Sequence, residues 1–403
     1  MHASVKAKAT YPVDYYPSVV YGYGINYDSW NPSTYQDAGI PDQEALWKDK
    51  ATGETCIPDG AIPEVEKTCF IDDYYLDNGY ASELVLDIYK PKGDQVHDAP
   101  IMVIFRGFGF DAVESTKNDD MVAFGQYFAE RGWVVFVPTY RGANARNGKF
   151  GAIPQAYYDL IHFHYSNIHT LNIANINLDE IIGSEGQAHG SYVSARDSKA
   201  ALRWIHANAS RFGGNSENIT AYGASSGAMI AIMLGVTNSD DFHTEIDETV
   251  DPTLIGNNPH ARSDVHTVIS HGGGTTLLKL RQWAFDGGDR MDASDAPTQL
   301  VVGTSDPYII PFGKRLQIKM KRQGIHTDLI NVPRSGHADM LDFIANNKTL
   351  FEHAFSFIVN QQDLRVDKSN PNPSSSEFTR FSNVDITLSW HKGRRYDPVK
   401  GCK

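Results

Sequence analysis

The pentapeptide Gly223-Ala224-Ser225-Ser226-Gly227 constrains this chain more than any other stretch. It follows a strand-like run at 218–222 and precedes a small, apolar, helix-like run at 228–234. A serine on a sharp strand-to-helix turn needs glycines on both sides, because a Cβ there would clash. The turn lifts the Ser225 hydroxyl off the sheet, beside a helix N-terminus that favours negative charge. We therefore predict a nucleophilic Ser225; the alternative is a Gly/Ser-rich loop, since short matches to this pattern arise by chance.

Short apolar runs alternate with helical stretches along the middle of the chain, as in parallel sheets built from βαβ units. The expected strands are 101–105, 133–138, 219–223, 265–270, 299–303 and 328–332, and the expected helices are 119–131, 194–209, 225–236, 311–323 and 348–360. A β-hairpin over 70–76 and 83–90, turning at Asp77-Asn78-Gly79, is expected before them. The pattern predicts an α/β fold with a mostly parallel central sheet flanked by helices.

Composition along the chain suggests three parts. Residues 1–67 are rich in Tyr, Pro, Asp and Gly and are expected to form an extended arm packed on the core. Residues 68–361 form the expected catalytic domain, and 362–403 a polar extension with one edge strand at 385–390. Insertions that do not fit the alternating pattern are predicted to be lids or pocket walls. They cover about 142–193, 237–262 and 271–296.

A serine hydroxyl is a poor nucleophile unless a base takes its proton and a third group orients that base. Asp306 lies just past one predicted strand, and His337 lies just past the next. Open α/β sheets build their sites at such C-terminal strand ends. Taken alone, each is equally well a turn aspartate or a loop histidine; their order and spacing favour an acid and a base. Asp295 and Asp289 are fallback acids, but they precede the strand.

The negative oxygen of an acyl-transfer transition state needs backbone N–H donors. One is expected from Ser226, and others from the loop 106–110, where two glycines follow a strand. His271-Gly272-Gly273-Gly274 is similar to an oxyanion motif but lies after the nucleophile, so it is predicted to be pocket wall. His271 as the base is a less favoured alternative, because it precedes the acid.

Residues 100–110, 134–142 and 197–227 resemble, in this order, the carboxylesterase/lipase branch of the α/β-hydrolase superfamily. The resemblance covers about 100–236, and the acid and histidine loops extend it to about 340. It implies an α/β-hydrolase fold with a lid or cap insertion, and chemistry that needs no cofactor. The site residues it implies are the triad Ser225, Asp306 and His337 and the oxyanion donors Phe108, Gly109 and Ser226.

The chain departs from the family pattern beside the nucleophile. Arg106 stands where the family usually has His, Phe108 where it has Gly, and Ala224 where carboxylesterases often have Glu. Arg106, Phe110 and His271 are expected to contact substrate. In the family, the position of Asp197 is a structural residue at a helix start.

The expected function is hydrolysis of carboxylic esters through an acyl-enzyme. Tyr and Phe residues in the 142–193 insertion and at 108–110 suggest an ester with an aromatic portion. A prolyl-oligopeptidase-like serine peptidase is an alternative, although Ala228 replaces its second glycine and 1–100 is too short for a propeller. A catalytically inactive binding protein is another, although such proteins typically lose the serine or the histidine.

The formal net charge of −13 over 403 residues argues against nucleic acid or an anionic membrane as the main partner. No apolar run is long enough to span a bilayer. The expected partner is a small-molecule ester, and the sequence makes no prediction of oligomeric state.

Cys56 and Cys69 lie in a loop-like, proline-containing stretch and are expected to form a local disulfide, leaving Cys402 over. A local disulfide favours a secreted or periplasmic protein, although the first residues do not have the pattern of a signal peptide. His162, His164, His169 and His189 raise the question of a metal. Because no Cys or carboxylate cluster supports them, we expect polar lid residues and no metal.

Overall fold

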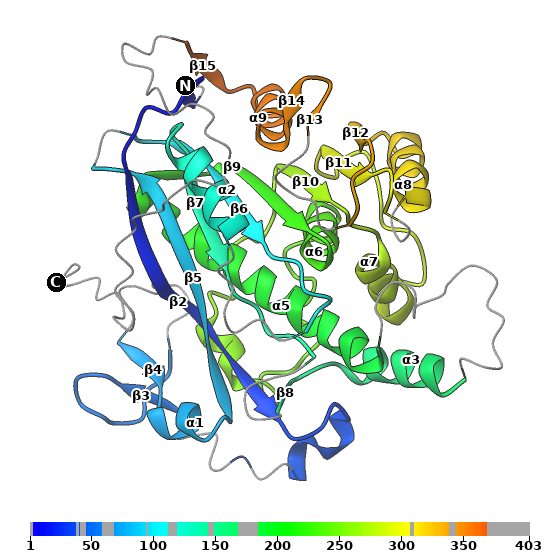
Figure 1. The fold of residues 1–403 in the computed structure, drawn as a ribbon. Helices are drawn as coiled ribbons and strands as arrows, with labels where there is room; N and C mark the ends of the chain where they lie inside the picture. Colours follow the sequence, from blue (N-terminus) through cyan, green and yellow to red (C-terminus); the bar gives the residue numbers. More distant parts are fainter. Residues whose placement is uncertain are drawn as a thin grey trace.

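The computed structural model describes residues 3–37, 40, 46–58, 68–93, 96–111, 119–143, 149–167, 184–306, 310–337 and 344–368. These residues build one large twisted sheet with helices on both faces (Figure 1). Within them, no helix is long and apolar enough to cross a membrane.

The large sheet has nine strands. In spatial order they are β12 (Thr327–Val332), β11 (Thr298–Gly303), β10 (Thr267–His271), β9 (Gly214–Ala224), β6 (Ala99–Phe105), β7 (Val134–Pro138), β5 (Ala81–Pro91), β2 (Val13–Tyr27) and β8 (Phe150–Gly151). Neighbours from β12 to β7 pair in parallel, whereas β5, β2 and β8 are added antiparallel. The predicted α/β class and mostly parallel sheet are confirmed.

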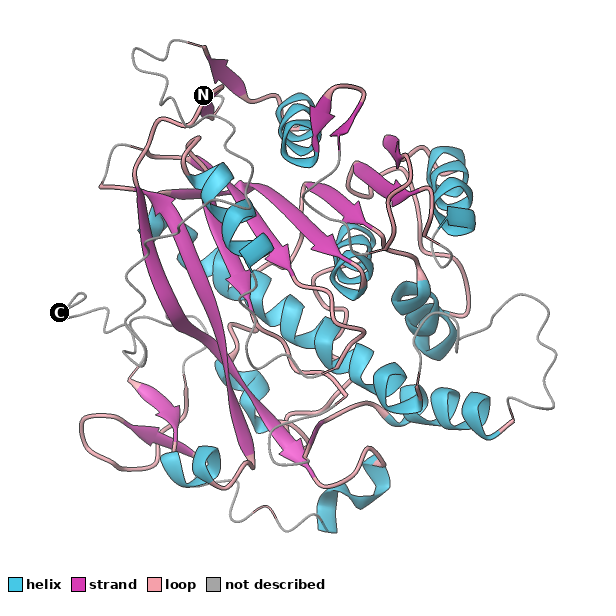
Figure 2. Cartoon of the chain, in the orientation of Figure 1, coloured by secondary structure: helices cyan, strands magenta, loops and turns pink. Residues whose placement is uncertain are grey.

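Helices and smaller elements surround this sheet (Figure 2). The helices are α1 (Asp73–Asp77), α2 (Asp119–Ala129), α3 (Gln155–Ser166), α5 (Glu185–Asn208), α6 (Ser226–Val236), α7 (Thr276–Arg281), α8 (Ile310–Arg322) and α9 (Leu350–Gln361). Shorter turns are η1 (Pro32–Asp37), η5 (Ala209–Phe212), η6 (Pro252–Gly256) and the π-helical η7 (Gln282–Asp286). Three two-stranded sheets pair β1 (Ser4–Lys6) with β15 (Arg365–Asp367), β3 (Trp47–Asp49) with β4 (Cys69–Ile71), and β13 (Ile344–Ala345) with β14 (Lys348–Thr349).

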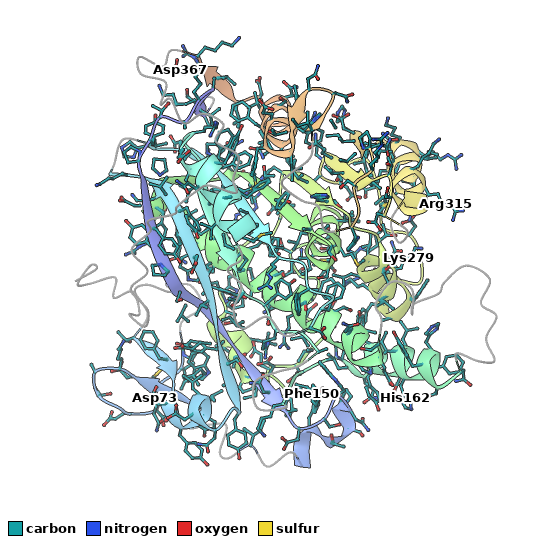
Figure 3. All side chains as sticks on the ribbon, in the orientation of Figure 1. Asp73, Phe150, His162, Lys279, Arg315 and Asp367 are labelled. Carbon is teal, nitrogen blue, oxygen red and sulfur yellow. A yellow bond between two sulfur atoms is a disulfide. The ribbon has the colours of Figure 1, made fainter. Side chains whose placement is uncertain are left out.

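Alternation along β6 explains the two layers of core, because successive strand residues point to opposite faces. Met102 lies in the apolar cluster with Phe124 of α2 and Phe351 of α9. Ile101 lies in the cluster on the other face, with Trp204 of α5. Side chains fill the space between the sheet and its helices (Figure 3). The sheet is thereby buried on both faces, and its strand ends hold fixed positions for a site.

The prediction that residues 1–67 form an arm packed on the core is wrong for their longest segment, because β2 is a strand of the main sheet. Its pairing with β5 shifts register between Tyr16 and Val19 and again between Val20 and Gly22. Ser18 lies at the first shift with a φ of 54°. These irregularities break the alternation by which a strand is recognised in sequence.

The expected hairpin over 70–76 and 83–90 is also wrong. β4 pairs with β3, while β5 pairs with β2 and β7. Asp77-Asn78-Gly79 instead ends α1, with Asn78 as its C-cap and Gly79 at a φ of 72°. Asn and Gly are common both at helix C-termini and in hairpin turns, so these three residues alone do not distinguish the two structures.

The expected 142–193 insertion is partly regular structure: it contains α3 and the first turns of α5, which starts at 185 rather than 194. Ser184 caps α5 by accepting from the Gln187 N–H. Asp197 consequently lies in the middle of α5 and not at a helix start. The Cys56–Cys69 disulfide is present, as predicted. Cys402 and the expected strand at 385–390 lie outside the described residues.

Candidate active site

The turn between β9 and α6 has the geometry of a nucleophile elbow. Ser225 sits between the two elements with φ 53° and ψ −121°, a strained conformation for a residue with a side chain. A Cβ on Gly223 would lie 2.0 Å from the Gly227 carbonyl oxygen, and one on Gly227 would lie 2.1 Å from the Phe105 oxygen. Only glycine fits at these two positions, as the sequence pattern requires. The Ser225 N–H donates to the His271 carbonyl of β10 at 2.9 Å, which ties the elbow to the neighbouring strand.

Asp306 and His337 meet Ser225 at the C-terminal ends of their strands. His337 Nδ1 lies 2.7 Å from Asp306 Oδ2, and His337 Nε2 lies 2.8 Å from Ser225 Oγ. The Asp306 side chain is 1% exposed, while the His337 side chain is 31% exposed. A buried carboxylate, an imidazole and a hydroxyl thus form one hydrogen-bonded line, open to solvent at the imidazole.

The alternative acids lie elsewhere, and the alternative base contacts the elbow through its backbone carbonyl. Asp289 pairs with Lys319 at 2.9 Å, and Asp295 accepts from the Asp292 N–H. His271 is 2% exposed beneath the elbow. The hydrogen-bonded line of side chains therefore joins Ser225, Asp306 and His337, and none of these alternatives takes part in it.

The loop after β6 lies directly against the nucleophile. A Cβ on Gly107 would lie 2.3 Å from the Ala224 carbonyl oxygen and 2.7 Å from Ser225 Cβ. Gly109 has a φ of 67°, where glycine is favoured. The Phe108 N–H, expected to be an oxyanion donor, instead donates to Ser226 Oγ at 2.9 Å. Sequence reasoning considered only the backbone of Ser226 and missed this hydroxyl contact, for which the pattern carries no signal.

The three residues expected to contact substrate differ in exposure. The side chains of Phe110 and His271 are 1% and 2% exposed and belong to the interior, so a substrate role does not fit either. Arg106 is half-buried, with its guanidinium carbon 5.2 Å from the centroid of the Phe108 ring. That ring is 57% exposed. Phe108 and Arg106 are therefore the side chains of this loop that a bound molecule can reach.

A family model described as BD-FAE, an α/β-hydrolase-type esterase family, matches residues 191–309, which include the elbow and Asp306. This part of the chain is therefore similar to an esterase family, and the fold is that of an α/β-hydrolase. Solved structures similar to it include those of Thermogutta terrifontis esterase 2. The butyrate-bound form is 19% identical, covers 71% of this chain and 91% of that chain, and has a TM-score of 0.45. The form phosphorylated by paraoxon is 19% identical, covers 69% and 89%, and also has a TM-score of 0.45. A comparison with curated proteins finds no match.

The buried part of α5 has charged side chains that form ion pairs with residues from distant segments of the chain. Asp197 holds Arg141 through both carboxylate oxygens, at 2.8 and 2.9 Å, and also accepts the Arg141 backbone N–H. Arg196 pairs with Asp251 at 2.8 Å, and both side chains are almost fully buried. The structural role expected for Asp197 is therefore that of an ion-pair partner, which aligns the end of β7 with α5.

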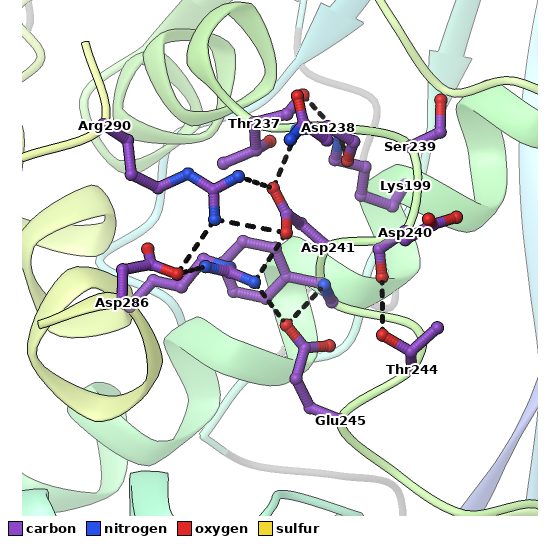
Figure 4. A network of polar contacts seen from close by, with 12 residues as sticks. Lys199, Thr237, Asn238, Ser239, Asp240, Asp241, Thr244, Glu245, Asp286 and Arg290 are labelled. Carbon is purple, nitrogen blue, oxygen red and sulfur yellow. Dashed lines mark hydrogen bonds and ion pairs between the residues drawn. The ribbon is translucent and has the colours of Figure 1, made fainter.

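Two of the expected pocket-wall insertions of the hydrolase are joined by an ion network (Figure 4). Arg281 of α7 contacts Asp241, Glu245 and Asp286 at 2.6, 2.7 and 2.5 Å. Arg290 contacts Asp241 at 2.7 Å and Asp286 at 3.0 Å. The network fixes the loop after α6 to the π-helical turn η7.

The histidines do not form a metal centre in the part of the hydrolase that the structure describes, where no group of three or more His, Cys, Asp or Glu could hold an ion. His162 and His189 both approach Glu185, at 3.3 and 3.6 Å. The His189 ring stacks on those of Trp30 and Tyr158, and burial lowers its pKa to about 4. His169 lies outside the described residues.

Proposed function

We propose that the protein hydrolyses carboxylic esters with Ser225 as nucleophile, His337 as general base and Asp306 as the residue that orients the imidazole. Ser225 Oγ attacks the ester carbonyl carbon while His337 Nε2 takes its proton. His337 then donates this proton to the leaving alcohol, and water releases the acid by the same route in reverse. The unbroken line from Asp306 Oδ2 through His337 to Ser225 Oγ carries the proposal.

The tetrahedral intermediate carries its negative charge on the former carbonyl oxygen, which needs N–H donors. The Ser226 N–H is suited to this role, because the first N–H groups of a helix have no partner within it. The helix N-terminus adds a favourable dipole. The Gly109 N–H is the second proposed donor, from the loop packed on Ser225.

The proposed substrates are esters with an aromatic portion. The exposed Phe108 ring supports this, since its backbone is bonded to the residue after the nucleophile. An aromatic acyl or alcohol group would stack on that ring, a contact worth about 0.5–1.5 kcal/mol beyond the area it buries.

The decisive experiment compares hydrolysis of p-nitrophenyl acetate by the wild type, Ser225→Ala and Ser198→Ala. The Ser198 hydroxyl is buried and donates within its own helix, to the Ser194 oxygen, so this variant controls for loss of a buried hydroxyl. We expect the Ser225 variant to lose at least about 10⁴-fold in kcat, as triad deletions do, and the Ser198 variant to stay active.

Other outcomes identify the alternatives. Cleavage of a prolyl-peptide p-nitroanilide without ester hydrolysis, dependent on Ser225, would favour a peptidase. A folded wild type that is inactive on both substrate classes would favour a binding protein.

We also propose that the protein works in an oxidising compartment, outside the cytosol. The Cys56–Cys69 disulfide supports this, because such bonds persist where thiols are not kept reduced. Fractionation of the source cells tests the proposal, and a cytosolic protein with both thiols free would contradict it.

A further inference from the structure

Two buried hydroxyl groups hold the oxyanion loop at both ends of a three-residue segment. At its start, the Arg106 carbonyl accepts from the Tyr140 hydroxyl. At its end, the Phe108 N–H donates to Ser226 Oγ at 2.9 Å. Ser226 also influences Tyr140, because it opposes the rise in pKa that burial causes in this phenol. Two side chains, one from the loop after β7 and one from the elbow, therefore hold the segment at both ends.

The direction of these hydrogen bonds follows from the available protons. Ser226 Oγ accepts from a backbone N–H, so its own proton is free to go to the Tyr140 oxygen. Tyr140 in turn donates to the Arg106 carbonyl, which can only accept. Burial raises the pKa of Tyr140 to about 12, so the phenol keeps its proton at neutral pH. Both residues are 2% exposed, so their bonds to the loop are shielded from water.

The two hydrogen bonds, Tyr140 to Arg106 and Phe108 to Ser226, are called the clamp below. Gly107 lies between the two residues that the clamp holds. Its Cα hydrogen faces the Ala224 carbonyl and Ser225 Cβ, at a separation too small for any side chain. A loop held this close sets the position of the next N–H groups relative to the nucleophile. In oxyanion sites, donors act only when they lie about 2.7–3.1 Å from the oxygen that becomes charged.

We propose that the Ser226 hydroxyl, supported by Tyr140, is a positioning residue of the oxyanion loop. Its oxygen accepts the Phe108 N–H, so this N–H does not bind the oxyanion. The same bond holds Gly107 against Ser225, and the N–H groups of Gly109 and Ser226 bind the oxyanion. The effect on oxyanion binding rests on the proposed ester hydrolysis, whereas the two hydrogen bonds that hold the loop do not depend on it.

The test compares Ser226→Ala and Tyr140→Phe with two matched controls. Ser198→Ala removes a buried serine hydroxyl away from the loop. Tyr35→Phe removes a buried phenol that, like Tyr140, donates to a backbone carbonyl, here that of Trp30. Unlike Tyr140, it also accepts a backbone N–H, that of Ile153. Steady-state kinetics with p-nitrophenyl acetate are measured for each variant and for the double variant Ser226→Ala/Tyr140→Phe.

We expect kcat to fall about 10- to 100-fold in either clamp variant, less than the loss of a whole donor, with KM within about threefold. The double variant should be little worse than either single one, because the two hydroxyls hold the same three-residue segment. Ser226→Thr, which keeps the hydroxyl, should recover most of the loss. Unchanged or raised kcat in Ser226→Ala, or equal losses in the controls, would overturn the proposal.

A second readout does not depend on activity. Amide hydrogen exchange of Phe108 should be slow in the wild type and fast in Ser226→Ala, while the exchange of α5 stays the same. Protection that persists without the hydroxyl would overturn the clamp even if the enzyme is an esterase. If Phe108 loses its protection from exchange in Ser226→Ala, but the protein shows no hydrolysis that depends on Ser225, the clamp is supported and the proposed function is rejected. If Ser226→Ala does not fold, Tyr140→Phe carries both measurements.

Discussion

His337 Nδ1 lies 2.7 Å from Asp306 Oδ2, and that carboxylate is almost completely buried. An ionised carboxylate can only accept, so it selects the tautomer with the proton on Nδ1 and the lone pair on Nε2. That lone pair faces Ser225 Oγ at 2.8 Å. Asp306→Asn keeps the shape but offers a donor, so kcat for p-nitrophenyl acetate should fall about 10⁴-fold, the effect of this change in a serine protease.

Asp295→Asn is the matched control for this prediction. Asp295 was a fallback acid, yet its carboxylate accepts from the Asp292 N–H in the loop before β11. The control should retain kcat within about twofold. If instead Asp295→Asn abolishes hydrolysis and Asp306→Asn does not, the acid has been misassigned.

The inner sheet and the site could be predicted because both depend on local apolar pattern and chain order. Six strands were predicted from apolar runs, and all six are present with shifted ends. In a parallel sheet the C-terminal ends of neighbouring strands lie at one edge. Once β11 and β12 were assigned, Asp306 and His337 were expected at the same sheet edge as Ser225, without knowledge of any side-chain packing.

The parts that could not be predicted depend on partners far away in the sequence. The charged residues inside α5 are buried because Arg141 and Asp251, which come from distant parts of the sequence, pair with them. The bulges of β2 are accommodated by pairing with β5. The hydroxyl of Ser226 acquires its role only when the loop at Phe108 folds over the elbow.

Phe108 is predicted to determine the preference for aromatic esters. Phe108→Leu keeps an apolar side chain but removes the ring, which is 57% exposed. kcat/KM for phenyl acetate should fall about three- to tenfold relative to that for ethyl acetate, which corresponds to the loss of one aromatic pair. Equal changes for both esters would show that the ring does not recognise substrate.

Arg281 is predicted to be the central residue of the ion network between the two insertions. Its side chain is 6% exposed and contacts three carboxylates. Arg281→Met fills a similar volume but leaves those charges with fewer partners, so the free energy of unfolding should fall by about 3–5 kcal/mol. Urea denaturation measures this change. Arg290→Met, at a more exposed site with 17% of its side chain accessible, should cost less; an equal or greater cost would contradict the assignment.

The Cys56–Cys69 disulfide is predicted to stabilise the segment carrying β3 and β4 without contributing to catalysis. The bond closes a short loop, with a sequence separation of 13 residues. Replacing both cysteines by serine should lower the free energy of unfolding by about 2–4 kcal/mol. The rate of ester hydrolysis at 25 °C should stay within about twofold of the wild type. A large loss of kcat in a folded double variant would connect this segment to the site.

Lys199 is predicted to give the stability of the protein a pH dependence above neutrality. Its ammonium is fully buried and donates to the carbonyls of Thr237 and Asn238 at 3.2 and 2.9 Å, at the end of the helix that starts after Ser225 (Figure 4). Burial is the main cause that lowers its pKa from 10.5 to about 7; Asp241 and Asp264 oppose the shift, while Arg203 and Arg281 add to it.

Between about pH 7 and 10.5 the unfolded chain therefore binds a proton at Lys199 that the folded chain has lost. Stability from this group consequently rises with pH across that window, by up to about 1.4 kcal/mol per pH unit, and below pH 7 the full cost of burying the charge remains. Lys199→Met should remove this slope, measured as the free energy of urea unfolding at pH 7, 8 and 9, whereas Lys321→Met, at an exposed position, should keep it. A slope that is identical in the wild type and in Lys199→Met would mean that Lys199 keeps the same protonation state in the folded and unfolded chain.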